Sequence, residues 1–580
     1  MFVLNIIAEG LLPVVVALAT GALIGTLAGE PAAIVPGADS PGAALGVIAA
    51  ALVLDLVILR FVSPAIEVLA HRVDLVVRER VLRAVLAPAT LAHLEDPELA
   101  DEFSLARSVG TEGYPTSATL VSLSTVATAR VLGLGSAVVL FAYGWWAPVL
   151  LTLAWLVSNG WYRGEMADLV ASFEGSAPGF RRAAYLSDLA LGGAAAKEIR
   201  LFGLARWLTG RFEEHWWRAL GQATSKRQAH RWGAARSALV LVASHGVVLG
   251  LLARSALRGE IAVGDLAVHA QAVLGLAGFA WDFDEEYRLR LGAAPFPHAL
   301  RIPEAVKSPR FQLPGSQPPP AARRGIRFRA VAFAYPGTER RVLEDVDLWL
   351  PAGTSLAIVG DNGSGKTTLM KLLCRFYDPT HGSIEVDGTD LRAIEASGWQ
   401  SHIAAMFQDF GRYPLSVRDN VAFGCLARYR DEASLDRAAA LAGCAPFVER
   451  LPGGWETPMS RQFRDGIEPS GGQWQRLALA RVLLAVDCGA QMLLLDEPTA
   501  NLDIRAEAAF YERFLDLTRG LTTILVSHRF STVRQAERIA VLSHGRIIEL
   551  GTHDELMSLN RTYASMFRLQ AERYLEASHA

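Results

Sequence analysis

The stretch that decides the fold of the second half of this chain reads Gly360-Asp361-Asn362-Gly363-Ser364-Gly365-Lys366-Thr367. Two glycines flank four residues, and a lysine and a hydroxyl residue follow, which is the phosphate-loop pattern. The apolar run Leu356–Val359 precedes it and the helix-forming run Leu369–Leu373 follows it. Glycines let the backbone wrap around phosphate oxygens, so that N–H groups at a helix start can bind them. We therefore expect a nucleotide-binding α/β domain, with Lys366 on the β- and γ-phosphates and Thr367 on Mg²⁺.

An acidic pair follows a second apolar run further along the chain. Met492–Leu495 is apolar throughout, and Asp496 and Glu497 come directly after it. An apolar strand that ends in two acids is common by itself, but paired with a phosphate loop it has the arrangement of a Walker B strand. In that arrangement Asp496 would hold Mg²⁺, and Glu497 would orient or deprotonate the attacking water.

Further motifs in the same region resemble those of ATP-binding cassette (ABC) proteins. The run Ser470-Gly471-Gly472-Gln473 resembles the signature motif of that family. The other matches, in the family's order, are Tyr335 for the aromatic residue that stacks on adenine, Gln408 for the Q-loop glutamine, Asp503 in Ala500-Asn501-Leu502-Asp503 for the D-loop, and His528 for the switch histidine. The resemblance covers residues 325–575.

What the resemblance implies is an ATPase that uses ATP and Mg²⁺. The catalytic roles would fall to Glu497, His528 and Gln408. Mg²⁺ would be held by Thr367, Gln408 and Asp496. Nucleotide binding would involve Tyr335, Gly360, Asp361, Asn362, Gly363, Ser364, Gly365, Lys366, Thr367, Thr368, Ser470, Gly471, Gly472, Gln473 and Asp503.

One residue departs from the family pattern. The usual signature begins with an apolar residue such as leucine, and Pro469 stands there in this chain. Proline lacks an N–H and restricts the residue before it to extended conformations. We expect Ser470 still to cap the helix that follows. A weakened site in an asymmetric heterodimer is the alternative, and the sequence leaves both open.

The first half is apolar enough to lie in a membrane. The whole chain is 51% hydrophobic and yet 20% charged, which indicates two unlike parts. Crossing a bilayer takes about 20 mostly apolar residues. Six windows qualify: Phe2–Ala28, Gly42–Ser63, Ala118–Tyr143, Trp145–Trp161, Ser237–Ala256 and Val263–Trp281. Lysine and arginine gather between the second and third windows and between the fourth and fifth, which places both termini in the cytoplasm.

The two long inner segments are expected to be helical extensions of the spans. Residues 64–108 and 162–236 are rich in Ala, Leu, Arg and Glu, with short breaks at Leu94–Pro97 and Leu191–Gly193. This half resembles the exporter-type membrane domain of ABC transporters, and the breaks look like its coupling-helix regions. The string Gly472–Arg476 is similar to the branch that includes lantibiotic and other peptide exporters.

The predicted fold class is a membrane α-helical bundle of six spans followed by an α/β P-loop NTPase domain. We expect a membrane domain over 1–291, a Pro-rich linker over 292–324, an ABC nucleotide-binding domain over 325–575 and a tail over 576–580. All four cysteines, Cys374, Cys425, Cys444 and Cys488, are expected as reduced thiols of a cytosolic domain.

The expected function is ATP-driven export across the cytoplasmic (inner) membrane by a homodimer or heterodimer of half-transporters embedded in the lipid bilayer. Peptides are the first expected cargo, and lipids or hydrophobic small molecules the second. Polar residues in the spans are candidate substrate contacts: Asp55, Arg130, His245, His269 and Gln271. The alternatives are an ATP-gated channel or regulatory subunit, an importer built on the exporter fold, and a soluble cassette ATPase. The net charge of −3 gives no positive electrostatic field of the kind that nucleic-acid-binding proteins use, so we expect no nucleic-acid partner.

Overall fold

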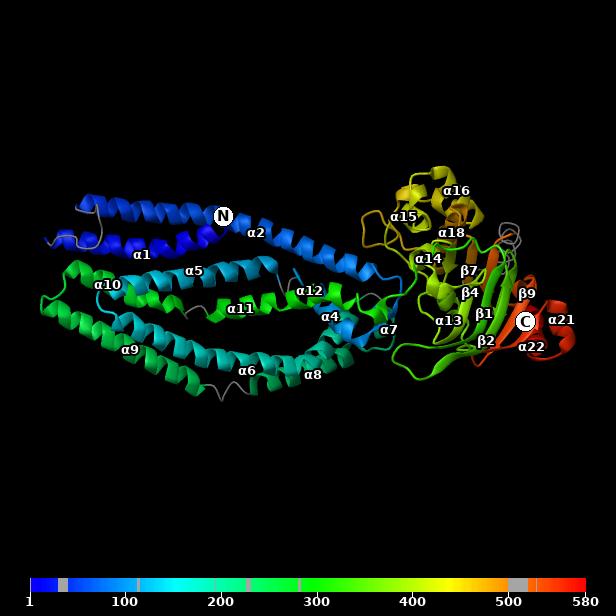
Figure 1. Ribbon diagram of the computed structural model, residues 1–580, viewed down its shortest axis with the longest axis horizontal. Helices are drawn as coiled ribbons and strands as arrows, with labels where there is room; N and C mark the ends of the chain where they lie inside the picture. Colours follow the sequence, from blue (N-terminus) through cyan, green and yellow to red (C-terminus); the bar gives the residue numbers. More distant parts are fainter. Residues whose placement is uncertain are drawn as a thin grey trace. The chain divides into compact units, whose positions relative to one another are not determined.

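The computed structural model describes residues 2–29, 40–111, 115–192, 195–225, 231–279, 283–498, 520–527 and 529–579. The chain divides into two compact units. A helical unit comprises Met1–Glu79 and Leu105–Ala299, and an ATPase unit comprises Arg80–Ser104 and Leu300–Ala580. The predicted fold class, a helical bundle followed by an α/β P-loop domain, is confirmed (Figure 1).

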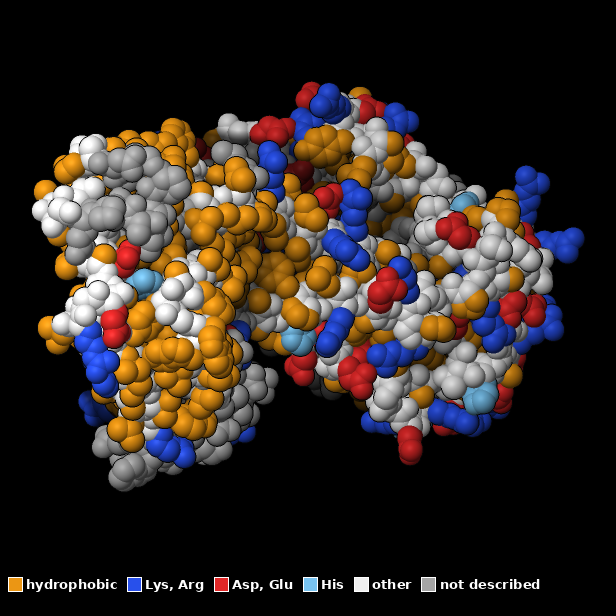
Figure 2. Space-filling model, turned by 60° about the vertical axis from the view of Figure 1, so that its left-hand side comes forward, with side chains coloured by type: hydrophobic (Ala, Val, Ile, Leu, Met, Phe, Trp, Pro, Cys, Tyr) orange, Lys and Arg blue, Asp and Glu red, His pale blue; other side chains and the backbone are white. Residues whose placement is uncertain are grey.

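Long helices that run side by side make up the helical unit (Figure 1). They are α1 (Phe2–Leu27), α2 (Pro41–Leu86), α5 (Thr116–Phe141), α6 (Trp146–Leu191), α8 (Ala205–Ser225), α9 (Arg231–Leu257), α10 (Val263–Gly275) and α11 (Phe283–Ala293), with the short α7 (Ala196–Leu201) and η2 (Leu276–Phe279). Much of the visible face of this unit is hydrophobic, whereas charges of both signs are scattered over the ATPase unit (Figure 2).

Five helical stretches are long and apolar enough to cross a membrane when the described residues are searched: Phe2–Leu27, Pro41–Ile58, Thr116–Phe141, Ala235–Leu257 and Val263–Ala305. The last comprises several elements, among them α10, η2 and α11, and runs over residues outside the described ranges. The fourth predicted window, Trp145–Trp161, lies in α6 but is not among them. Its apolar run is interrupted by the polar Ser158 and Asn159, both buried. Among the described residues, five of the six predicted windows thus qualify as spans by length and composition, and the fourth lies in a helix that does not.

The predicted extension of the spans beyond the apolar windows is confirmed in two helices. Helix α2 continues unbroken from Pro41 to Leu86, and α6 from Trp146 to Leu191. The predicted breaks also appear, because α6 ends at Leu191 and the short helix α3 (Ala92–Glu95) is separated from α4 (Pro97–Arg107) by Asp96.

A close crossing joins α5 to the end of the α10–η2 segment. A side chain on Gly278 would place its Cβ 2.2 Å from the carbonyl oxygen of Ala129 in α5. Arg130 holds the same crossing, since its Nη1 donates to the Gly278 carbonyl at 2.8 Å and its Nη2 lies 3.8 Å from Glu286. The backbones can approach this closely only because position 278 carries no side chain.

We expect Gly278→Ala to lower the free energy of unfolding by about 1–3 kcal/mol, because the new methyl group must push the two backbones apart. The matched variant is Gly250→Ala in α9, where a Cβ would meet nothing within 4 Å. Alanine there should be neutral or slightly stabilising, because it reduces the entropy lost on helix formation. Thermal unfolding of both purified variants checks the difference. Equal midpoints would show that the crossing is looser than described.

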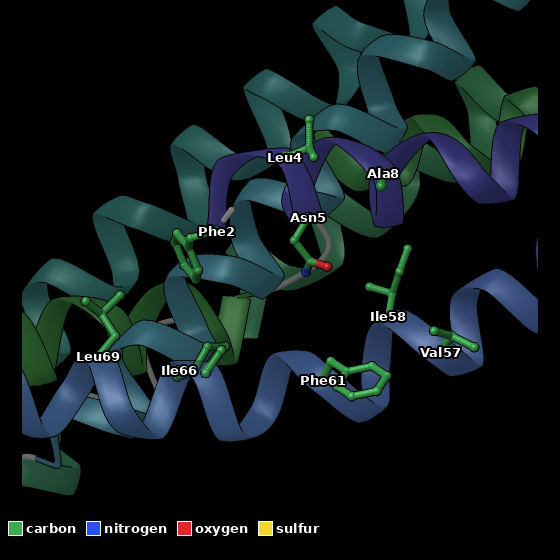
Figure 3. Close-up of a pocket in the computed structure, with 10 residues that line it drawn as sticks. Phe2, Leu4, Asn5, Ala8, Val57, Ile58, Phe61, Ile66 and Leu69 are labelled. Carbon is green, nitrogen blue, oxygen red and sulfur yellow. The ribbon is translucent and has the colours of Figure 1, made fainter.

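A cavity of about 430 Å³ lies between the N-terminal turns of α1 and the middle of α2 (Figure 3). It is lined by Phe2, Leu4, Asn5, Ala8, Val57, Ile58, Phe61, Ala65, Ile66 and Leu69. Asn5 supplies the only amide of this lining, and its Nδ2 is buried without an acceptor among the described residues. The cavity is otherwise apolar, as expected between two candidate spans.

Two sheets form the framework of the ATPase unit (Figure 1). The first has the order β2-β1-β4-β5, with β1 (Gly325–Ala334), β2 (Arg341–Pro351), β4 (His381–Val386) and β5 (Thr389–Asp390) all antiparallel. The second has the order β10-β9-β3-β8-β7-β6, with β3 (Ser355–Val359), β6 (Ile403–Met406), β7 (Met492–Asp496), β8 (Thr522–Val526), β9 (Arg538–Ser543) and β10 (Arg546–Gly551). In it β6, β7, β8, β3 and β9 are parallel, and their carboxyl ends share one edge.

Helices pack around these sheets. The main ones are α13 (Lys366–Leu373), α14 (Ala396–Gln400), α15 (Val417–Ala422), α16 (Glu432–Leu441), α17 (Ala445–Glu449), α18 (Gly471–Asp487), α20 (Phe530–Val533), α21 (His553–Leu559) and α22 (Thr562–His579). Strands β3 and β7 are buried at nearly every position, which explains their unbroken apolar sequences.

Part of the segment predicted as a stiff linker is helical. Helix α12 covers Pro295–Ala305, and a 3₁₀ turn, η3, covers Pro309–Phe311. Pro295 and Pro297 lie in the first turn of α12, where backbone N–H groups have no helical partner to lose, and only Pro303 stands further inside. Proline content alone therefore did not identify this helix.

The expectation of four reduced thiols is wrong for one pair. The structure joins Cys425 to Cys488 in a disulfide, with their Cα atoms 6.4 Å apart, and leaves Cys374 and Cys444 buried and free. Cys425 follows α15 and Cys488 caps the end of α18. These helices are held together by Arg481, whose Nε donates to the Asn420 carbonyl at 2.7 Å. This tertiary packing, which spacing does not reveal, brings the two sulfurs together.

Candidate nucleotide-binding site

The phosphate loop lies between the carboxyl end of β3 and the start of α13, as predicted. Gly360 and Gly365 have φ values of +151° and +108°, which residues with side chains rarely adopt. A Cβ at Gly360 would lie 2.0 Å from the Leu542 carbonyl oxygen, and one at Gly365 would lie 2.6 Å from Leu343 Cδ2. The loop therefore needs glycine at both positions, for conformation and for space.

Two groups in this loop fit a bound phosphate. Ser364 is only 4% exposed, and its buried Oγ has no hydrogen-bond partner among the described residues. Lys366 is 7% exposed, and its Nζ donates to the carbonyls of Gly360 and Asp361, both at 2.8 Å. Burial lowers the pKa of Lys366, against the opposing effect of the carboxylates of Asp496, Glu497 and Asp361. A phosphate anion beside the ammonium group would offset that burial.

The Walker B acids lie where the loop can meet them. Thr367 Oγ1 donates to Asp496 Oδ2 at 2.8 Å, although 129 positions separate them in sequence. Asp496 ends the buried strand β7 and is 2% exposed. A hydroxyl and a carboxylate are hard oxygen ligands of the kind that Mg²⁺ prefers, with phosphate and water completing its shell. In the described part of the chain, no group of three or more His, Cys, Asp or Glu side chains is placed to hold a metal ion by itself.

Glu497 has an unusual backbone. Its φ is +50°, a conformation uncommon for residues other than glycine, and its N–H donates to the Val526 carbonyl at 2.9 Å. Gln408, just after β6, donates from Nε2 to Glu497 Oε2 at 3.3 Å. The carboxylate and the amide thus face each other at the carboxyl edge of the sheet.

Gln475 is a site residue that the motifs did not indicate. Its side chain is 2% exposed, and Nε2 donates to the Glu497 carbonyl at 3.3 Å. The only signal in the sequence is a polar residue beside Trp474 and Leu477 in a helix of mostly apolar residues. It anchors the turn that carries the predicted catalytic carboxylate.

Tyr335 lies beside the phosphate-loop helix. Its hydroxyl is 3.1 Å from Thr368 Oγ1, and Lys371 Nζ lies 5.5 Å from the centre of its ring. The ring is half-buried against Phe333 and Tyr377. One aromatic face near the loop could stack on a base, which is worth about 1–3 kcal/mol where such stacking has been measured.

The signature motif starts α18 and makes its hydrogen bonds there. Ser470 Oγ accepts from the Gln473 N–H at 3.4 Å, and Gln473 Oε1 accepts from the Ser470 N–H at 2.7 Å. The cap that we expected of Ser470 despite Pro469 is therefore present. Within the described residues, no hydrogen bond joins Ser470–Gln473 to the phosphate loop. Asp503 and His528, the predicted D-loop and switch residues, lie outside the described residues.

The polar residues predicted in the spans have different surroundings. Arg130 is engaged at the α5–η2 crossing, and His245 Nδ1 lies 2.8 Å from the Leu241 carbonyl of its own helix. His269 is 4% exposed, and neither ring nitrogen has a hydrogen-bond partner in the part of the chain that is described. Asp55 is exposed on α2, and Gln271 is half-buried on α10. Two of the five thus have structural roles.

Comparisons with known proteins agree with this geometry. Residues 343–500 match the family model described as ABC transporter. The chain is 42% identical over 256 residues to an ATP-dependent lipid A-core flippase of Alkalilimnicola ehrlichii, covering 44% of this chain and 42% of that protein. It is 33% identical over 387 residues to an ATP-dependent lipid A-core flippase of Nitrosococcus oceani, covering 64% and 61%. A putative multidrug export ATP-binding/permease protein of Bacillus subtilis is 38% identical over 251 residues, covering 43% and 41%.

A solved structure extends the likeness to the whole chain. It is described as a bacterial Atm1-family ABC exporter with ATP bound, and superposes with a TM-score of 0.80 over 98% of this chain and 99% of the other, at 23% identity. The predicted resemblance to exporter-type ABC half-transporters is confirmed for the ATPase domain and for the fold. The matched segments span about two fifths of the length of the Alkalilimnicola and Bacillus relatives.

Proposed function

We propose that this chain, with an ABC ATPase domain and the fold of an ABC exporter, is an ATP-hydrolysing half-transporter of the inner membrane. The observation that carries the proposal is the assembly of Lys366, Thr367, Asp496, Glu497 and Gln408 at one edge of a parallel sheet. In the described ranges of the same chain, five helices are long and apolar enough to cross a membrane. The ATPase unit then lies in the cytoplasm, as the Lys and Arg of the inner segments predict.

Each site residue has a role in hydrolysis. Lys366 and the N–H groups of the loop bind the β- and γ-phosphates, and Ser364 Oγ donates to a phosphate oxygen. Thr367 and Asp496 would hold Mg²⁺, which would neutralise charge on the phosphates when bound. Glu497 accepts a proton from the attacking water, and Gln408 positions that water beside it. His528 and Asp503 remain predictions for the γ-phosphate and the D-loop.

We propose further that two chains are needed for one complete site. Ser470–Gln473 lie at the free N-terminal end of α18, and their hydrogen bonds satisfy only the helix start. The exposed N–H groups there suit a phosphate that belongs to a second copy or to a related chain. Closure of two such domains on ATP then drives the membrane helices between inward-open and outward-open states.

A lipid is the cargo that we favour over a peptide. The Alkalilimnicola and Nitrosococcus relatives are both named as lipid A-core flippases, which outweighs the short resemblance of Gly472–Arg476 to peptide exporters. The test is ATP hydrolysis and cargo movement by the full chain in vesicles, with anionic lipids and cationic peptides offered separately. Lipid-stimulated hydrolysis with lipid movement between leaflets is the expected result. Stimulation by peptides alone would favour the peptide cargo, and conductance without turnover would favour the channel.

A further inference from the structure

One segment of the chain, residues 88–98, belongs to the ATPase unit together with the end of α2 and most of α4. Thr90 Oγ1 donates to the Phe376 carbonyl at 2.8 Å, and the Leu91 N–H donates to the same oxygen at 3.4 Å. Gln400 Nε2 donates to the Ala89 carbonyl at 3.1 Å. Leu91 also packs against the hydrophobic core of the unit. These contacts dock the segment on the turn that follows the phosphate-loop helix.

The end of this segment makes one side-chain bond to a buried tyrosine. The Tyr377 hydroxyl donates to Glu95 Oε2, across 282 positions of sequence. Tyr377 is 4% exposed, and its pKa is raised first by burial and then by Glu95, so the hydroxyl keeps its proton and remains a donor. Next to it, Asp96 pairs with Arg310 at 3.2 Å. Arg310 thus holds the residue next to Glu95.

The ring of Tyr377 borders the aromatic residue predicted to stack on adenine. The ring centres of Tyr377 and Tyr335 are 5.5 Å apart and meet edge to face. Phe333 closes the group, at 5.0 Å from Tyr335 and 5.5 Å from Tyr377. Tyr335 in turn reaches the phosphate-loop helix through Thr368. One side chain therefore separates Glu95 from the face that a base would use.

We propose that Tyr377 is a positioning residue that sets the ring of Tyr335 for the nucleotide base according to the position of Glu95. The inference rests on the proposed function, because it assigns the base to Tyr335. On the far sides of Arg80 and Ser104 the helices α2 and α4 continue into the helical unit, so movement of those helices shifts Glu95. The hydroxyl bond transmits that shift to the ring of Tyr377, and ring packing transmits it to Tyr335. The path from Glu95 to Tyr335 therefore affects binding of the base. It is separate from Gln408, which acts on the attacking water.

The test compares Tyr377→Phe with the wild-type full chain in lipid vesicles. The ring remains, so the dissociation constant of Mg·ATP is expected to rise about three- to tenfold while kcat at saturating ATP stays within about twofold. Inorganic tripolyphosphate, which has no base, should compete as in the wild type. If the substitution loosened the phosphate loop in general, the affinities for ATP and for tripolyphosphate would both fall, and the proposal would be overturned. An unchanged ATP affinity would also overturn it.

Changes at Glu95 give a second test from the other partner. Glu95→Gln keeps an oxygen acceptor and should bind ATP as the wild type does, whereas Glu95→Ala should match Tyr377→Phe. The double variant should be no worse than either single one, because both remove the same bond; additive losses would contradict the proposal. The control is Tyr429→Phe, which removes a hydroxyl bond to Asp419 at 2.9 Å elsewhere in the unit. Because binding is measured directly, a wild type that binds ATP but does not hydrolyse it would contradict the proposed ATPase and leave this comparison valid.

Discussion

Replacing Glu497 by Gln is expected to lower the rate of ATP hydrolysis about 10²- to 10⁴-fold while ATP still binds, because the amide cannot accept the proton of the attacking water. The structure supports this role in three ways. The carboxylate follows the buried strand β7, its backbone is held at φ +50°, and Gln408 lies 3.3 Å away. The amide has nearly the shape of the carboxylate, so the fold should not change. Steady-state hydrolysis and binding of a fluorescent ATP analogue measure the two quantities.

The control for this substitution is Glu537→Gln, which makes the same change at an exposed carboxylate. It should hydrolyse ATP at the wild-type rate. If Glu497→Gln also kept that rate, the general base would have to be another group. If it lost binding as well, Glu497 would be holding the metal or the loop rather than the water.

The central part of the site could be predicted from the sequence because each motif carries its own local geometry. The phosphate loop needs glycine where φ is positive, and the acids follow an apolar run typical of a buried parallel strand. Parallel strands bring their carboxyl ends to one edge, so the contact between Thr367 and Asp496 followed from two short stretches of sequence. The Ser470 cap could be predicted because a capping box depends only on the N-cap residue and the residue three positions later, here Gln473.

The features that sequence did not predict depend on tertiary packing between distant segments. The bond between Tyr377 and Glu95 joins two residues that carry no motif. The bond between Cys425 and Cys488 arises where α15 meets the end of α18. Gln475 acts on Glu497 through a backbone carbonyl, which any residue would offer. In each case the residue type is ordinary, and only its neighbour in space gives it a role.

Replacing Lys366 by Met is expected to weaken Mg·ATP binding about 10- to 150-fold. The substitution removes charge-assisted hydrogen bonds to phosphate, which are worth about 1.5–3 kcal/mol. Lys307→Met is the matched control, because that lysine is exposed and pairs with Glu304 at the surface. Equilibrium binding of Mg·ATP to both variants measures the effect. Wild-type affinity in Lys366→Met would show that the loop does not hold the phosphates.

The same substitution should leave the nucleotide-free protein nearly as stable as before. The pKa of Lys366 is lowered in the folded state, so the charged form costs stability at pH values below the folded pKa, and this cost disappears as the pH rises above the unfolded value. Methionine removes that cost together with the bonds to the Gly360 and Asp361 carbonyls. We expect the two effects to cancel to within about 1 kcal/mol at neutral pH. Lys366 would then be a buried cation that adds little to the stability of the nucleotide-free protein and acts mainly by binding phosphate. Glu497 acts in the next step, the hydrolysis of the bound nucleotide.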